Sequence, residues 1–121
     1  RSATGDAGGT WRPATATALP NPDSSVALVR LADGRLLAAA NPSESAANTL
    51  ALFVSDDGGT TWRRVRTIES SSRADDQFRY PALACAPDGS IRLAWSVNRQ
   101  SIRVRSLSPS ALGSSDGRAL P

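Results

Sequence analysis

The chain of 121 residues is predicted to be an all-β repeat protein, and three observations support this fold class. Short apolar runs with alternating polar residues follow one another along the chain, as in β-strands. Asp-Gly pairs at 33–34 and 88–89 separate several of these runs, as in tight hairpins. These Asp-Gly turns, and the tryptophans Trp11 and Trp62, recur after about 50–55 positions, a period typical of the blades of a β-propeller.

Each period contains strands that can be placed in order. The expected strands are residues 26–31, 35–40, 49–54 and 62–68, followed by 80–86, 91–97 and 102–107. With the strands of a four-stranded antiparallel blade lettered A to D from the axis outward, residues from Thr10 onward supply strand D of a first blade. One complete blade and strands A to C of a third follow. Residues 1–107 are thus predicted to form about two blades of a propeller, and the Ser-, Gly- and Pro-rich residues 108–121 a C-terminal tail.

An open set of blades exposes apolar sheet faces, so the blades are expected to need further partners. The remaining blades can belong to the same parent chain, of which this sequence is a fragment, or to identical chains that assemble into a ring. Three copies would give six blades, with strand D of one chain completing the last blade of its neighbour.

The composition excludes several kinds of chemistry. The chain has no histidine, which rules out a Ser-His-Asp triad, a Cys-His pair and a histidine-ligated metal within it. Its single cysteine, Cys85, can form no internal disulfide and no cysteine-based metal cluster, and it is expected to be a small buried side chain. The net charge of +3 comes from scattered arginines interleaved with acids, so no nucleic-acid partner is expected. No apolar run is long enough for a membrane span, and neither a metal nor a cofactor is expected.

Two copies of one motif, Thr4–Trp11 and Ser55–Trp62, follow the pattern Ser/Thr-x-Asp-x-Gly-x-Thr-Trp. Its aspartate can accept backbone N–H bonds across a tight turn, its glycines permit positive φ, and its tryptophan can pack over the turn. The motif is therefore interpreted as structural, with no acid–base role for its aspartates. The residues predicted to hold the two hairpins are Asp6, Gly8, Thr10 and Trp11, then Ser55, Asp57, Gly59, Thr61 and Trp62.

These motifs resemble the Asp boxes of the sialidase (neuraminidase) family and its BNR-repeat relatives, with segments similar to the C-terminal part of bacterial sialidase-like proteins. The resemblance implies a six-bladed propeller with a carbohydrate site on its axis. It also implies an arginine triad for the substrate carboxylate, a Tyr–Glu nucleophile and an Asp acid/base. Secretion or a periplasmic location follows from the resemblance alone, and the residues leave the compartment open.

The segment 78–83 resembles two parts of the family. In one alignment Arg79 takes the place of a carboxylate-binding arginine, and in the other Tyr80 matches the nucleophilic tyrosine. Arg99 is a second candidate for the carboxylate, and Asn21 and Asp23 precede an inner strand, where loops can contact a sugar. Structural alternatives stand beside these roles: a rim-packing tyrosine, solvated arginines and an ordinary Asn-Pro-Asp-Ser turn.

The function expected from this resemblance is part of an exo-sialidase-type glycoside hydrolase acting on acidic glycans, with the chain not catalytically complete alone. Two alternatives stay open: a non-catalytic glycan-binding or scaffold propeller, and a small two-blade protein that assembles into a ring.

Overall fold

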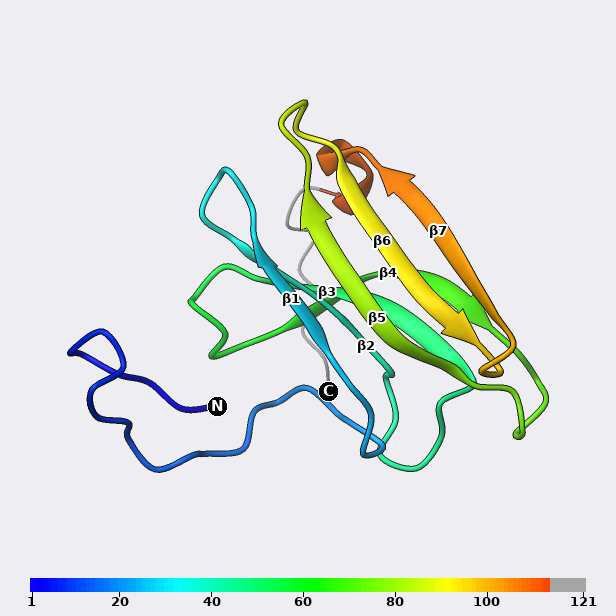
Figure 1. The fold of residues 1–121 in the computed structure, drawn as a ribbon, viewed down its shortest axis with the longest axis horizontal. Helices are drawn as coiled ribbons and strands as arrows, with labels where there is room; N and C mark the ends of the chain where they lie inside the picture. Colours follow the sequence, from blue (N-terminus) through cyan, green and yellow to red (C-terminus); the bar gives the residue numbers. More distant parts are fainter. Residues whose placement is uncertain (114–121) are drawn as a thin grey trace.

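A computed structural model describes residues 1–113 and confirms the all-β prediction (Figure 1). A four-stranded sheet, which we call sheet A, has the order β1-β2-β3-β4, and a three-stranded sheet B has the order β5-β6-β7, all neighbours being antiparallel. The strands are β1 (Ala27–Arg30), β2 (Leu36–Ala40), β3 (Thr49–Ser55), β4 (Arg63–Ser70), β5 (Phe78–Cys85), β6 (Ile91–Val97) and β7 (Ser101–Leu107). No helix within residues 1–113 is long and apolar enough to cross a membrane.

The two Asp-Gly turns close equivalent hairpins in the two sheets. Asp33 accepts the backbone N–H of Arg35 at 3.1 Å and pairs with its guanidinium, while Gly34 takes a φ of 90°. In sheet B, Asp88 accepts the backbone N–H and the hydroxyl of Ser90 at 2.8 and 2.6 Å. Hydrogen bonds from Arg35 and Ser90 respectively lower the pKa of Asp33 and of Asp88. Local side-chain chemistry therefore sets both turns, as the sequence predicts.

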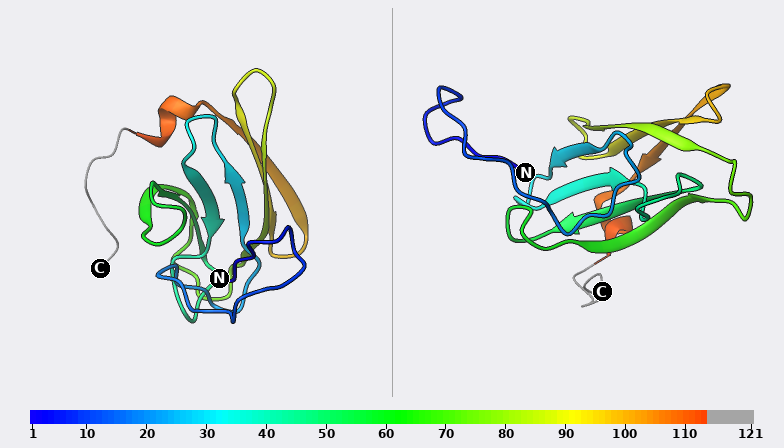
Figure 2. Two further views of the ribbon diagram at one scale, coloured as in Figure 1. Left: turned by 90° about the vertical axis from the view of Figure 1, so that its left-hand side faces the viewer. Right: turned by 90° about the horizontal axis from the view of Figure 1, so that it is seen from below.

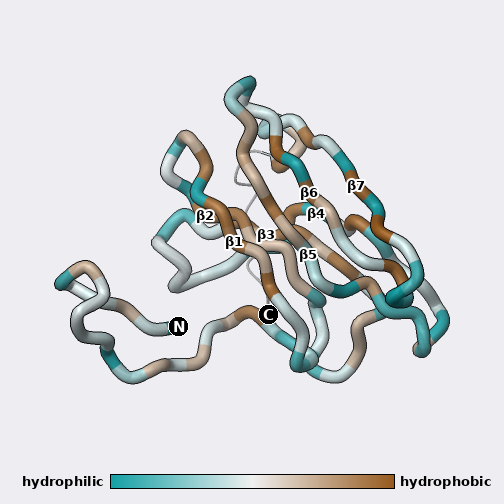
Figure 3. Tube along the Cα trace, viewed as in Figure 1, coloured by the Kyte–Doolittle hydropathy of each residue, from teal (hydrophilic) through white to brown (hydrophobic). Residues whose placement is uncertain are grey.

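The main core lies between the two sheets, where β1 packs against β5. Alternation along β2 and β3 sends one set of side chains to this core and the other set to the opposite face of sheet A. The tube in Figure 3 is hydrophobic along these strands and hydrophilic along the loop between β4 and β5. At the outer strands, Arg103 of β7 pairs with Glu69 of β4. The core residues are Leu31, Leu37, Ala39, Leu50, Leu52, Val54, Ile68, Phe78, Ile91, Leu93, Trp95, Leu107 and Leu112.

Two local expectations differ from the structure. The strand expected from Thr10 onward is absent among the described residues. Residues 1–3 pair instead with residues 12–15 in a hairpin whose tip projects from the sheets (Figure 2). Without a sheet beside it, this segment has no ladder to extend. Cys85 is exposed instead of buried, because it is the last residue of β5, an edge strand of sheet B.

The segment expected as a C-terminal tail begins with packed structure. Residues Pro109–Leu112 form a short 3-10 helix, capped by Ser108, and the side chain of Leu112 is buried in the main core. The remainder of that segment, residues 114–121, lies outside the described residues.

The two Asp-containing hairpins are each held by the same pattern of hydrogen bonds. Asp57 accepts the N–H of Thr61 at 2.8 Å and its hydroxyl at 2.6 Å, and Ser55 donates its hydroxyl to Asp57. In the first copy, Asp6 accepts the N–H of Thr10 at 2.8 Å and its hydroxyl at 2.7 Å. The same spacing of residue types therefore produces the same turn twice.

Their tryptophans differ in environment. Trp62 is buried against sheet A with Phe53. Trp11 stacks near Gly8 of its own turn but stays 62 % exposed, since no sheet lies under the first hairpin. Trp11 therefore does not anchor its hairpin to a sheet in the way that Trp62 does.

Protonation of Asp57 is expected to weaken the second hairpin. Hydrogen bonds, chiefly from Thr61, lower the pKa of Asp57 from 3.8 to about 2. Because the pKa of Asp57 is lower in the folded state than in the unfolded state, its ionised carboxylate stabilises the fold above about pH 4. This stabilisation is lost as the pH falls toward about 2. We expect Asp57→Asn to lower the urea midpoint of unfolding at pH 7. We also expect the midpoint of this variant to change less between pH 4 and pH 2 than that of the wild type. Asp56→Asn changes the neighbouring carboxylate, outside this network, and is the control; equal pH dependence in both variants would contradict the prediction.

Candidate functional site

The candidate site lies at the edge of the molecule where β1 and β5 begin. The loop before β1 and the first residues of β5 meet there, since the Arg79 guanidinium donates from Nη1 to the backbone oxygen of Asp23 at 3.4 Å. The turn between β6 and β7 reaches the same edge, where Asn98 Oδ1 accepts the N–H of Gln77 at 2.6 Å. Three segments far apart in the sequence therefore share one edge.

Tyr80 occupies a bulge in β5. The β5–β6 register pairs Arg79 with Ser96 and Ala82 with Ala94, so Tyr80 and Pro81 together face one residue of β6. Tyr80 has a φ of 53°, a conformation that bulky side chains rarely adopt, and its side chain is 56 % exposed. Pro81 has no N–H for the ladder, which suits the irregularity. Such strain concentrates at functional positions, so the bulge marks Tyr80 as a candidate.

Tyr80 lines an open hollow of about 620 Å³ together with residues of β6, β7 and the turn between them. Arg99 lies in that turn, which is closed by the bond from Gln100 N to Val97 O at 2.9 Å. Arg99 also has a left-handed backbone, with a φ of 58°. The hollow is of a size that accommodates a small ligand. The structure thus brings two of the predicted residues to one concave surface, lined by Tyr80, Ser96, Arg99, Gln100, Ser101 and Ile102.

The other predicted residues do not line this hollow, and Asn21 lines a different one on sheet A. Arg79 is engaged with the Asp23 backbone, and its Nε is buried without a hydrogen-bond partner among residues 1–113. Asp23 has a φ of 55°. Asn21 uses its amide within its own turn, accepting from Ser24 N at 2.6 Å and donating to Ser24 O at 2.8 Å. Its side chain therefore shapes the loop.

Ser96, Gln100 and Ser101 also line the hollow, although the sequence did not predict them as site residues. The polar run from 98 to 101 between two alternating strands signals a hairpin turn, but it does not show which strand ends face a ligand. The bulge, by contrast, is indicated in the sequence by Pro81, because a proline inside a strand is typical of an edge or a bulge.

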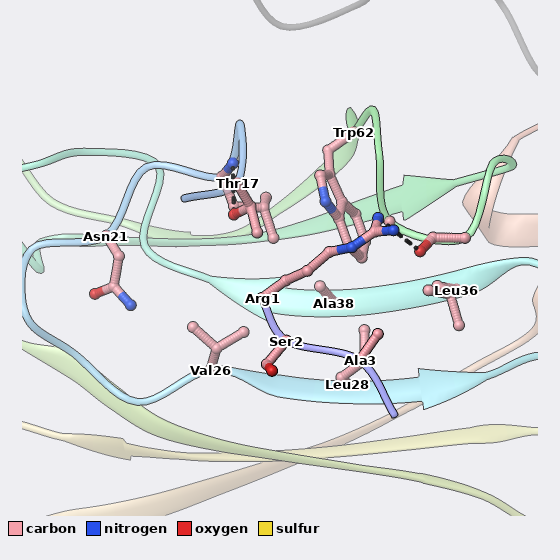
Figure 4. Close-up of a pocket in the computed structure, with 13 residues that line it drawn as sticks. Arg1, Ser2, Ala3, Thr17, Asn21, Val26, Leu28, Leu36, Ala38 and Trp62 are labelled. Carbon is pink, nitrogen blue, oxygen red and sulfur yellow. Dashed lines mark hydrogen bonds between the residues drawn. The ribbon is translucent and has the colours of Figure 1, made fainter. Parts of the chain in front are cut away.

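A second hollow, of about 480 Å³, lies on the outer face of sheet A (Figure 4). The side chains of Val26 and Leu28 line one side of it and Trp62 the other, with Arg1 between them. Its lining is mostly apolar, and Leu28 is 56 % exposed. Outward-facing residues of sheet B are also apolar, since Ile102 and Val104 are exposed. These exposed apolar side chains are suited to packing against further sheets, whereas Phe53 and its neighbours on the same face of sheet A are already buried.

Within the described residues, no group of three or more His, Cys, Asp or Glu side chains is placed to hold a metal ion. The side chains that line the hollow offer a phenol, a guanidinium, hydroxyls and an amide. Together these groups can bind an anionic, hydroxyl-rich ligand.

Replacing Arg99 with glycine is expected to stabilise the fold while removing the guanidinium from the hollow. Glycine adopts the left-handed conformation without the clash of a Cβ, so we expect a gain of up to about 1 kcal/mol. Gln100→Gly, at a neighbouring position outside the left-handed region, is the control and should be destabilising. Urea unfolding of both variants checks this, and an equal loss of stability in both would show that the backbone at Arg99 is not strained.

Comparisons with known proteins give a family match and likenesses to solved structures. Residues 1–93 match a family described as "BNR repeat-like domain". No curated protein matches the chain. Among solved structures, an alpha-L-arabinanase from Penicillium chrysogenum complexed with arabinobiose is similar, with a TM-score of 0.45 and 24 % sequence identity. The similarity covers 64 % of this chain and 26 % of the arabinanase, so the matched region spans about a quarter of that enzyme.

Proposed function

The chain belongs to the BNR repeat-like domain family, and on that premise we propose that it contributes two adjoining blades and part of the active site to a six-bladed, exo-sialidase-type glycoside hydrolase acting on acidic glycans. The observation that carries this proposal is the convergence of Tyr80 and Arg99 on one hollow, both with left-handed backbones.

Each of the two side chains has a distinct role in this proposal. Arg99 is exposed, and a guanidinium can bind a carboxylate through two parallel hydrogen bonds. Tyr80 presents a phenol beside it, and tyrosine is the nucleophile of the sialidase type of glycosidase. A carboxylate held by Arg99 would orient an acidic sugar over the Tyr80 hydroxyl.

The chain supplies only part of such a site. Of the residues that line the hollow, none carries a carboxyl group, whereas glycoside hydrolysis requires a general acid. The missing acids would come from other blades. Exposed apolar side chains on both sheets, Leu28 on sheet A and Ile102 and Val104 on sheet B, support the presence of such neighbours, in the same parent chain or in identical chains.

Substrate turnover tests the proposal directly. The full-length protein containing these residues should hydrolyse a fluorogenic sialoside and leave the fluorogenic glycoside of a neutral sugar intact. Turnover of neutral arabino-oligosaccharides alone would contradict the acidic substrate. The requirement for a carboxylate is checked by Arg99→Gln, which should raise KM far more than it lowers kcat.

The second candidate function is glycan binding without catalysis. It is favoured by the absence of a carboxyl group from the residues lining the hollow. Saturable binding of sialylated glycans with no release of sugar by the full-length protein would establish this function in place of hydrolysis.

Assembly of identical chains into a ring is tested by mass. Light scattering after size exclusion should give three times the chain mass if the neighbouring blades come from identical chains. A monomer at high concentration rules out the ring and leaves the same parent chain as the source of the neighbouring blades.

A further inference from the structure

Asn41 is the most deeply buried polar side chain near the candidate site, with 1 % of its surface exposed. It follows β2 directly in sheet A. Its side-chain nitrogen donates to the backbone oxygens of Thr49 at 2.6 Å and of Phe78 at 2.9 Å. Phe78 is the first residue of β5, so this amide joins sheet A to the first strand of sheet B.

The backbone of Phe78 is held on both sides by the same loop of sheet A. Its N–H donates to the oxygen of Ala47 at 2.8 Å, and its oxygen accepts from Asn41. The Phe78 side chain is itself buried in the core between the sheets. The position of residue 78 is therefore set by sheet A as much as by its own sheet.

The residue after Phe78 is held from the other side. Ser96 of β6 donates its hydroxyl to the oxygen of Arg79 at 3.2 Å. The bulge begins directly after Arg79, with Tyr80 in the left-handed conformation. A bulge needs fixed residues before it, because the strained residue would otherwise relax into the extended strand.

Asparagine suits this position because its nitrogen meets only acceptors. Besides the two short bonds, the same nitrogen lies 3.5 Å from the oxygen of Ala47. The Asn41 oxygen is buried and has no hydrogen-bond partner among the described residues, so the side chain acts here as a donor. An aspartate would place negative oxygen atoms against the same carbonyl oxygens.

We propose that Asn41 is a positioning residue for Tyr80: by tying Phe78 to sheet A, its amide fixes the bulge that presents Tyr80 to the hollow. The positioning itself stands on these contacts, and only its consequence for catalysis rests on the proposed function.

Tyr80 is the only tyrosine in the chain, so fluorotyrosine gives a single ¹⁹F resonance that reports its surroundings. In the labelled full chain, Asn41→Ala is expected to shift or split this resonance. Phe53→Leu is the matched control, because Phe53 is fully buried on the opposite face of sheet A and contributes to a different cluster. It should lower stability and leave the resonance in place.

An unchanged resonance in a folded Asn41→Ala variant would overturn the proposal. Should that variant fail to fold, Asn41→Ser, whose shorter side chain withdraws the donor from the Phe78 oxygen, replaces it under the same criterion. In the full-length enzyme, Asn41→Ala should lower kcat by about 10²-fold with a smaller change in KM, as expected for a misplaced reacting group.

The two proposals can fail separately. A shifted resonance in a protein without hydrolytic activity would support the positioning by Asn41 and refute the enzymatic function. An active protein in which Asn41→Ala alters neither the resonance nor kcat would refute the positioning alone.

Discussion

Tyr80→Phe is expected to reduce hydrolysis of a fluorogenic sialoside on the order of 10³-fold or more, with little change in stability. The substitution removes only the phenol oxygen and keeps the ring and the left-handed backbone of the bulge. Because the side chain is 56 % exposed, the loss of its hydroxyl should not disturb the core. The kcat of the full-length protein measures the effect, and the urea midpoint verifies the fold.

Two arginine variants with the same change in charge distinguish an effect of the hollow from an effect of surface charge in general. Arg99→Gln is expected to raise KM, while Arg66→Gln removes an exposed arginine from β4 and should leave both constants unchanged. A Tyr80→Phe variant with the kcat of the wild type would remove the nucleophile from the proposal and favour the binding function.

Phe53→Ala is expected to destabilise the chain by about 3–5 kcal/mol. Phe53 is fully buried on the face of sheet A opposite to the main core. Its buried neighbours there are Ala38, Ala40, Ala51 and Trp62, and alanines have no flexible side chains with which to fill a cavity. The cavity should therefore persist, which places the loss toward the upper end of the range. Urea unfolding of the 121-residue chain measures it.

Leu28→Ala on the same face provides the contrast. Leu28 is 56 % exposed in this chain, so its truncation should cost less than about 1 kcal/mol. In a closed propeller the neighbouring blade would cover Leu28, and the same change should cost clearly more in the full-length protein. Equal costs in the two proteins would indicate that no blade packs on this face.

Much of the fold could be predicted because its signals are local. The strands from 26 to 107 lie within a few residues of their expected positions, because the alternation of apolar and polar residues in a strand can be seen over a few neighbouring residues. The Asp-Gly hairpins also follow from short-range chemistry, as the bonds of Asp33 and Asp88 to residues two positions later show.

The candidate site was only partly predictable. Tyr80, Arg79 and Arg99 could be selected by residue type and motif, yet the sequence left open which of them share a surface. The pairing of Arg79 with Ser96 and of Ala82 with Ala94 decides this, because one extra residue in a strand redirects the side chains that follow it. The role of Asn41 could not be predicted from the sequence, because its hydrogen-bond partner Phe78 is 37 positions away.

The all-β class, the repeat, the seven strands between residues 26 and 107 and the Asp-Gly turns follow from the sequence, since each depends on residues close in the chain. Tertiary structure alone decided the exposure of Cys85 and Trp11, the burial of Leu112, the convergence of Tyr80 with Arg99 and the link from Asn41 to β5. These features depend on strand register and on packing between sheets, where the energy comes from contacts between distant residues.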